Sequence, residues 1–338
     1  MGTYKFNYRL LVIFTIFFLS LCSFTFADCP SADFSGDCRV DFEDLNLLAA
    51  EWLNDCDLSN NLCGGADLIG DGRIDFLDFN VMASQWQDKE IHIVWVDIND
   101  SGAGMKDELG NPISYSGFSG KMSKYETTNA QYCKFLNDAF ATGDITVSLN
   151  GNYIYGANGS DNGVDFEGQI YYYLEGSGFG YDGAINGGAS RINYTGSFFA
   201  VDSGFEQHPV TYVSWYGATA FCNYYGFRLP NEWQWQAVAD YDSSYIYGCG
   251  DNISNSMANY RGSDHPNGTT VVGAFGTSGY GLADMAGNVW EWTDSWYDNF
   301  CVFRGGGWYD SAQYCTVSSR YNYYPTSMFS YLGFRVCR

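Results

Sequence analysis

The stretch HPVTYVSWYGATAFCNYYGFRLPNEWQWQ, residues 208–236, decides the fold class of the larger part of the chain. Within it, WYGATAFCNYYG (Trp215–Gly226) predicts a helix that ends at a glycine. Upstream, TTNAQYCKFLNDAF (Thr127–Phe140) predicts an amphipathic helix with Thr or Asn as its N-cap. IHIVWVDI (Ile91–Ile98) is typical of a strand, and short β-type runs broken by Gly, Asn and Asp dominate from there on. We therefore expect an α+β domain with two helices and much loop.

Two further segments extend this outline. Residues 142–205 are rich in Gly, Tyr and Asn and predict an irregular insertion. After Gly250 no pattern predicts a helix. The chain of 338 residues is long enough for a second domain beside this one.

The first residues have the features of an export signal. Lys5 and Arg9 precede the apolar run Leu10–Cys22, and Thr25–Ala27 is a cleavage site of the small-x-small type. The apolar run is too short for a transmembrane helix. We expect a signal peptide over residues 1–27 and a secreted, extracellular product with no membrane span after its removal.

Charge and cysteine content restrict the class of partner. The formal net charge is −23, with 39 acidic against 16 basic residues, which argues against nucleic acid and anionic membranes and suits calcium. Of the 11 cysteines, an even number remains once Cys22 leaves with the signal. In an oxidising compartment an even set predicts disulfides.

A short motif occurs twice before the large domain, as ADFSGDCRVDFEDLNLLAAEW (Ala32–Trp52) and ADLIGDGRIDFLDFNVMASQW (Ala66–Trp86). Each copy is an Asp- and Gly-rich loop followed by apolar residues at helical spacing. The loops have the ligand spacing of an EF-hand, at positions 1, 3, 5, 7 and 12. The candidate calcium ligands, with Arg contributing its carbonyl, are Asp33, Ser35, Asp37, Arg39 and Asp44 in the first loop and Asp67, Asp71, Arg73 and Asp78 in the second. Ile69 cannot act as a ligand, so we expect the second site to be weaker.

The paired repeats, with Asp at position 12, resemble the dockerin module. The resemblance implies a small all-α module over residues 28–87 that docks onto a cohesin-like or other protein. Docking would use positions 10 and 11, which here are Phe42-Glu43 and Phe76-Leu77 rather than a small hydroxylated pair. Four cysteines belong to this module and allow three pairings, namely Cys29, Cys38, Cys56 and Cys63.

Five blocks in order carry a second resemblance, over residues 92–338. They are YETTNAQYCKFLN (Tyr125–Asn137), the opening stretch at 208–236, GYGLADMAGNVWEWTDSWY (Gly279–Tyr297), RGGGWYDS (Arg304–Ser311) and YLGFRVC (Tyr331–Cys337). Together they resemble the sulfatase-modifying-factor family, which includes the formylglycine-generating enzyme. The resemblance implies a C-type lectin-like fold, in agreement with the α+β class expected above.

The same resemblance implies two calcium sites and one disulfide. The first site would use Asn259 and Asp264 side chains with the carbonyls of Tyr260 and Pro266. The second would use Asp284 and Glu291 side chains with the carbonyls of Gly287 and Val289. The implied disulfide joins Cys222 to Cys337. Ordinary Asn and Asp turns are the alternative explanation of both calcium motifs.

The catalytic copper positions of the family are altered in this chain. Active members hold Cu(I) with two thiolates after a Gly-Gly-Ser turn, since soft thiolates select that ion. Here the two thiolate positions are Asp310 and Cys315, and Gly307 replaces the serine. The resemblance therefore assigns no catalytic residue in this chain, and bound copper is not expected. Cys133, Cys249, Cys301 and Cys315 remain unassigned, with Cys301 the nearest candidate for a disulfide with Cys315.

No other catalytic constellation is present, and the three histidines, His92, His208 and His265, do not suggest an iron site. We expect a secreted, calcium-binding protein whose large domain is a binding or scaffold domain for carbohydrate or peptide. The alternatives are an active formylglycine-generating oxidoreductase that modifies sulfatases, or an accessory protein of carbohydrate degradation. Five aromatic residues are candidates either for a ligand-stacking surface or for the core: Trp290, Trp292, Trp296, Trp308 and Tyr309.

Overall fold

The structure is a computed structural model that describes residues 42–52, 63, 66–85, 91–157, 166–174, 190–261 and 268–338. The chain divides into two compact units, Met1–Asp88 and Lys89–Arg338. The expected signal peptide and the candidate ligands Asp33, Ser35, Asp37, Arg39, Asp264 and Pro266 lie outside the described residues. Within the described ranges, no helix has the length and apolar character needed to cross a membrane.

Two helices pack together in the first unit: α2 (Phe42–Ala50) and α4 (Phe76–Gln85). Their shared core contains Leu48, Ile74 and Met82, all fully or almost fully buried. Cys63 belongs to this core and is disulfide-bonded, with its partner outside the described residues. The apolar spacing that predicted two loop–helix repeats is thus used to bury one face of each helix.

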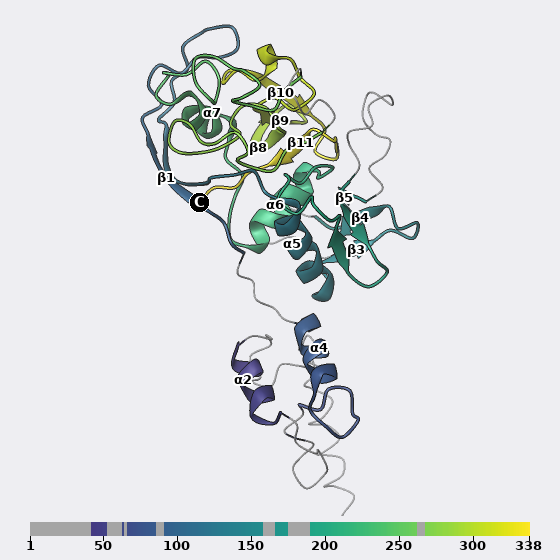
Figure 1. The fold of residues 1–338 in the computed structure, drawn as a ribbon. Coiled ribbons are helices and arrows are strands. Elements are labelled where there is room, and N and C mark those ends of the chain that lie inside the picture. Colours follow the sequence, from purple (N-terminus) through teal and green to yellow (C-terminus); the bar gives the residue numbers. More distant parts are fainter. Residues whose placement is uncertain are drawn as a thin grey trace, which may run out of the picture. The chain divides into compact units, whose positions relative to one another are not determined.

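The second unit mixes helices with short strands and long connections (Figure 1). Its helices are α5 (Asn129–Ala141), α6 (Trp215–Tyr224), α7 (Glu232–Asp240) and the 3₁₀ turn η3 (Ala312–Tyr314). Its strands are β1 (Trp95–Asp100), β2 (Phe118–Ser123), β3 (Ile145–Val147), β4 (Tyr153–Gly156), β5 (Ile170–Tyr173), β6 (Ile192–Tyr194), β7 (Phe199–Val201), β8 (Trp290–Tyr297), β9 (Phe300–Arg304), β10 (Arg320–Tyr323) and β11 (Leu332–Phe334). The α+β class predicted from the sequence is confirmed.

Four small sheets make up the β-structure of the described residues. The largest has the order β10-β9-β8-β11, in which β11 runs parallel to β8 and the other neighbours are antiparallel. β1 pairs with β2, β3-β4-β5 form a meander, and β6 pairs with β7. The last two sheets lie within residues 142–205, so that segment is not merely irregular: alternating apolar residues such as Ile145, Ile154 and Ile192 are buried there.

Each long helix begins at a side-chain cap. Thr128 caps α5 in a capping box with Gln131, and Ser214 caps α6. A third helix, α7, was not predicted, although Asn231 and Gln234 form a second capping box at its start. Helices α5 and α6 lie side by side (Figure 1), and Phe135 meets Phe221 edge to face at 5.7 Å.

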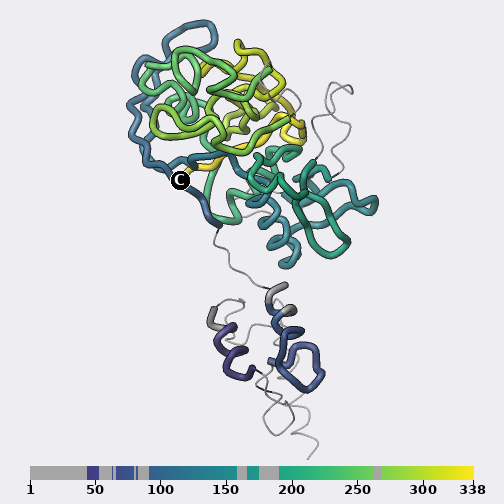
Figure 2. The backbone as a smooth tube through the Cα atoms, in the orientation of Figure 1, coloured from purple at the N-terminus to yellow at the C-terminus, as the bar shows by residue number. Residues whose placement is uncertain are grey.

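The last residues of the chain contact strands β2 and β8 of the second unit. Lys121 in β2 and Arg338 exchange two backbone hydrogen bonds, of 2.8 and 2.9 Å. Figure 2 shows the C-terminus beside this early part of the unit. Just before it, the Arg335 side chain is fully buried among residues of β8 and β2. Residues more than two hundred positions apart in sequence therefore share one layer.

Candidate functional site

The loop that follows β9 holds Asp310 and Cys315, the two positions at which the resemblance implies the copper ligands. Gly305 and Gly306 have positive φ angles of 106° and 76°, and the chain turns there before η3. A Cβ on Gly306 would lie 2.6 Å from Cys315 Sγ, so only glycine lets the thiol pack against this turn. Cys315 has 0% exposure. Burial raises the pKa of its thiol, and the neighbouring Asp310 and Cys249 raise it further.

Asp310 accepts hydrogen bonds through both its carboxylate and its backbone carbonyl. Its Oδ2 accepts a hydrogen bond from the Trp290 indole at 2.7 Å and another from the Gly307 amide at 3.1 Å. Its backbone carbonyl accepts from the Arg261 amide at 2.8 Å. This carboxylate therefore fixes the loop by bonding to side chain and backbone.

These residues do not fit the copper ion that the fold family implies. Cu(I) needs thiolates, but the two positions offer one carboxylate and one buried thiol whose raised pKa keeps it protonated. The Gly307 amide bonds to Asp310, and Gly307 has no hydroxyl to add. No step of a copper oxidase can be assigned to this loop.

The second calcium site implied by the resemblance stays a prediction, and its Glu291 already has other partners in the structure. Both oxygens of Glu291 bond to the Arg335 guanidinium at 2.6 Å, and Oε2 also accepts from the Trp235 indole at 2.6 Å. Glu291 and Arg335 each have 0% exposure. A carboxylate committed to a buried guanidinium is poorly placed to ligate calcium. Burial tends to lower the pKa of Arg335, but Glu291, Glu126 and Asp284 together outweigh burial and the pKa is raised.

The remaining residues of that motif serve the same polar core. Asp284 Oδ2 accepts from the Gly273 amide at 2.5 Å, and burial raises the pKa of Asp284 to about 6. Glu126 accepts from the Val289 amide at 3.1 Å, and burial together with Asp284 and Glu291 raises its pKa well above the usual value. The Gly287 amide bonds to the Gly305 carbonyl at 2.9 Å.

The first calcium motif of the large domain is only half described. Asn259 is fully buried and its amide donates to the Gly268 carbonyl at 3.0 Å. Tyr260 packs against the small cluster that contains Cys315. Among the residues that the structure describes, no group of three or more His, Cys, Asp or Glu side chains is arranged to hold a metal ion.

In the second repeat loop of the first unit, backbone amides donate hydrogen bonds to the loop's own carboxylates. Asp67 accepts from the amides of Gly70, Asp71 and Gly72 at 2.8–3.1 Å. Asp78, from the first turn of α4, is fully buried and accepts from the amides of Leu68 and Ile69 at 2.7 and 3.2 Å. Asp44 is equally buried at the matching place in α2. Asp71 accepts from the Arg73 amide at 3.0 Å.

The cysteines of the two expected disulfides of the large domain are free in the structure, and both pairings stay predictions. Cys222 and Cys337 are neighbours whose thiols influence each other, but both are free in the structure. Cys301 and Cys315 are also free, and they belong to different clusters. Cys301 lies at the start of β9, whereas Cys315 packs against Gly306 beyond its end, because the extended strand carries the two positions apart.

The five candidate aromatic residues divide unequally. Trp290, Trp292 and Trp308 are buried, and their indoles donate to Asp310, the Val213 carbonyl and the Ser330 carbonyl. They belong to the core, which is one of the two alternatives that the sequence left open. Tyr309 is half-buried, with Arg261 stacked on its ring at 4.3 Å. Only Trp296 of the five is exposed.

A polar pocket of about 630 Å³ lies directly after η3. Its lining combines two tyrosines, several hydroxyl and amide side chains and two charged residues: Glu108, Gln313, Tyr314, Thr316, Ser318, Ser319, Arg320, Tyr321 and Asn322. Tyr321 is 46% exposed and its ring meets Tyr314 edge to face at 5.8 Å. The pocket therefore combines aromatic faces with hydrogen-bonding groups.

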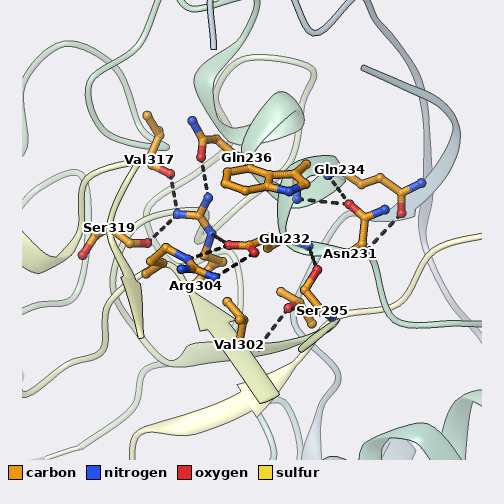
Figure 3. A network of polar contacts seen from close by, with 12 residues as sticks. Asn231, Glu232, Gln234, Gln236, Ser295, Val302, Arg304, Val317 and Ser319 are labelled. Atoms are coloured by element: carbon orange, nitrogen blue, oxygen red, sulfur yellow. Dashed lines mark hydrogen bonds and ion pairs between the residues drawn. The ribbon is translucent and has the colours of Figure 1, made fainter. Parts of the chain in front are cut away.

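A buried arginine holds one wall of this pocket in place (Figure 3). Arg304 donates to the carbonyls of Val317 and Ser319 at 3.1 and 2.7 Å, and to the Gln236 side chain. Its Nε lies 3.7 Å from Glu232 Oε2. Burial lowers the pKa of Arg304 to about 10, so it remains charged at neutral pH.

Glu232 connects the same network to β10. It accepts two hydrogen bonds from Arg320, at 2.8 and 2.9 Å, while its amide donates to Ser295. Sequence reasoning missed these residues and the pocket. Arg304 begins the RGGGWYDS block, and a charged residue at the end of an apolar strand was the one signal that pointed to them.

A family model matches residues 101–338 and describes them as a sulfatase-modifying factor enzyme 1-like domain. The chain belongs to the sulfatase-modifying factor family. Among solved structures, CarF aligns with a TM-score of 0.50 at 20% identity, covering 74% of this chain and 98% of that one, and this likeness shows the fold alone.

Curated relatives of this sulfatase-modifying factor family protein carry different names. A protein named serine/threonine-protein kinase pkn1, from Chlamydia caviae, is 32% identical over 50% of this chain and 31% of its own length. An inactive C-alpha-formylglycine-generating enzyme 2 from Bos taurus is 34% identical over 38% of this chain and 50% of its own. A formylglycine-generating enzyme from Mus musculus is 31% identical over 38% and 44%. The chain thus spans half or less of each relative's length.

Proposed function

We propose that the large domain is a binding domain that lacks copper-dependent oxidase activity. The observation that carries the proposal is the pair Asp310 and Cys315, in which a hydrogen-bonded carboxylate stands where a thiolate is needed and the one thiol is buried. A relative named as inactive, found beside one named as an active enzyme, supports loss of activity within this family.

Titration with Cu(I) under reducing conditions tests this directly. We expect no stoichiometric Cu(I) binding by the unaltered chain, because one neutral thiol does not make a Cu(I) site. Cys315→Ser should therefore leave the titration unchanged. Cys133→Ser, which removes another buried cysteine far from the loop in sequence, is the matched control. One equivalent of Cu(I) lost only in Cys315→Ser, with oxygen-dependent oxidation of a cysteine peptide from a sulfatase, would establish the oxidase instead.

The polar pocket beside β10 is the ligand site in this proposal, and its chemistry favours an uncharged carbohydrate. Tyr321 offers a partly exposed aromatic face on which a sugar ring can stack. Gln313, Ser318 and Asn322 offer donors and acceptors for hydroxyl groups. Arg320 is already paired with Glu232, which leaves little positive charge for an acidic ligand. Carbohydrate binding also suits an accessory protein of carbohydrate degradation.

Replacement of Tyr321 by Ala is expected to weaken binding of a responsive oligosaccharide about tenfold, since a lost stacking contact costs roughly 1.4 kcal/mol. Tyr323→Ala is the matched control: it lies two residues further along β10 and has the same 46% exposure, but it does not line the pocket. A glycan panel followed by calorimetry provides the measurement. Equal losses in both variants, or binding of peptides alone, would contradict the carbohydrate assignment.

For the first unit we propose calcium binding and docking to a protein partner. The carboxylates of Asp67 and Asp78 supply the hard oxygen ligands that calcium prefers. Phe76 and Leu77, at the docking positions of the second repeat, are 73% and 52% exposed. Export from the cell, expected from the first residues, belongs to the same proposal.

Removal of calcium by EDTA is expected to lower the melting temperature of the first unit by several degrees, because a ligand that binds only the folded state stabilises it. Asp78→Asn should melt at that lower temperature with or without EDTA. Asp97→Asn, an exposed carboxylate of β1, is the control and should keep the EDTA response. An EDTA-insensitive melt of the unaltered chain would refute calcium binding.

A further inference from the structure

Two cysteines from distant parts of the sequence, Cys249 and Cys315, belong to the same small buried cluster. Tyr247 pairs with Thr316 in an antiparallel bridge, and the Val317 amide donates to the Ile246 carbonyl at 2.9 Å. Continuation of this register places Gly248 opposite Cys315, with Cys249 as the next residue. The segment that carries Cys249 therefore runs alongside the segment that carries Cys315.

Cys249 lies in a tight turn beside this cluster. Tyr247 and Gly250 exchange two backbone hydrogen bonds, of 2.8 and 2.9 Å, so Gly248 and Cys249 form the tip of the turn. Gly248 lies against the chain, since a Cβ there would be 2.1 Å from the Met285 carbonyl oxygen. Cys249 packs against the small cluster formed by Ala258, Ala286 and Cys315.

The chemistry of the two thiols favours a covalent bond to each other over a metal. Burial raises the pKa of Cys249 to about 11, and burial raises that of Cys315 as well, so both are neutral thiols. Soft metal sites need thiolates, whereas two adjacent thiols need only an oxidant. Cys249 is the accessible member, because it is partly exposed while Cys315 has no exposure.

We propose that Cys249 and Cys315 form a disulfide when the protein meets a disulfide-bearing oxidant, such as oxidised glutathione or a dithiol–disulfide oxidoreductase. The Cys249 thiol loses its proton and attacks one sulfur of the oxidant, which gives a mixed disulfide and releases one thiol. Cys315 then displaces the second thiol of the oxidant and forms the Cys249–Cys315 bond. Two electrons and two protons pass to the oxidant, whose own disulfide is reduced.

The bond would fasten one wall of the pocket. Tyr314 and Thr316, which line the pocket, flank Cys315 directly. Cross-linking Cys315 to the 247–250 turn ties this lining to a second part of the domain. The oxidation state of the pair therefore sets how firmly the segment after η3 is held.

Peptide mapping of the full chain, air-oxidised in a glutathione buffer and digested without reduction, tests the proposal. We expect one linked peptide that contains Cys249 and Cys315. In denaturant without reductant, Cys249→Ser should expose Cys315 to alkylation, whereas the control Cys133→Ser should leave the linked peptide intact. Alkylation of both cysteines in the unaltered chain, or a Cys301–Cys315 peptide, would overturn it.

A melting experiment gives an independent readout. Cys249→Ser and Cys315→Ala should each lower the melting temperature of the oxidised large domain by about 10 °C, because the bond closes a long loop of chain. The two variants together should cost no more than the larger single loss. Equal melting temperatures for the oxidised and reduced chains would contradict the proposal. Neither experiment involves a ligand, so failure here leaves the proposed binding function untouched.

Discussion

Replacement of Arg335 by Met is expected to lower the free energy of unfolding of the large domain by about 4 kcal/mol. The guanidinium is completely buried and bonds to both oxygens of Glu291. It also donates to the carbonyls of Ser123 and Ala283, so it links β2, β11 and the loop before β8. Methionine fills a similar volume but leaves Glu291 as an uncompensated buried charge.

Urea unfolding provides the measurement for this variant. Arg338→Met is the matched control, because Arg338 is exposed and stacks on Trp95 at 4.5 Å, and its replacement should cost less than about 1 kcal/mol. The double variant with Glu291→Gln should recover part of the loss, since the unpaired charge is then removed. A single-variant loss below about 1 kcal/mol would show that the buried ion pair does not hold the domain.

The second large effect is expected at Arg304. Arg304→Met should destabilise the domain by about 3 kcal/mol, because the carbonyls of Val317 and Ser319 and the Gln236 side chain lose a buried donor. Ser319 lines the pocket and Val317 lies between the lining residues Thr316 and Ser318, so ligand binding should be lost even at temperatures where the variant remains folded.

Arg320→Met separates the loss of stability from the loss of ligand binding. Arg320 lines the pocket and pairs with Glu232, but it is partly exposed, so its loss should cost less than about 1.5 kcal/mol of stability. Urea unfolding and calorimetry with the oligosaccharide selected by the panel measure both properties. If Arg304→Met retained full affinity, the network would be unconnected with the pocket.

Local signals predicted the helices well where caps and spacing agreed. The predicted helix over 215–226 is α6 with its last residues removed, and the predicted helix over 127–140 begins at Asn129 after the Thr128 cap. Helix α7 was missed because its tryptophans and glutamines give no clear apolar stripe, although Asn231 and Gln234 carried a capping-box signal. The strands of residues 142–205 are three or four residues long, too short for a periodicity argument.

The site was far less predictable, because its parts come together only in the fold. Glu108 lies more than two hundred residues before the other pocket residues, and Arg304 reaches them through carbonyls that carry no sequence signal. Trp290 and Trp308 were ambiguous until their indole partners were known. The substitution at Asp310, in contrast, was visible in the sequence, since the position alone identifies what the residue replaces.

The parallel pairing of β11 with β8, and the backbone bonds between Arg338 and Lys121, have a consequence for how the chain acquires its structure. During synthesis, β2 can pair with β1 at once, but its bonds to Val336 and Arg338 must wait until residues more than two hundred positions later have been made. Contacts of such wide sequence separation slow folding. A ribosome-bound chain that lacks residues 332–338 leaves the carboxylate of Glu291 without its guanidinium. Strands β1 and β2 are therefore expected to depend on chaperones until translation of the domain is complete.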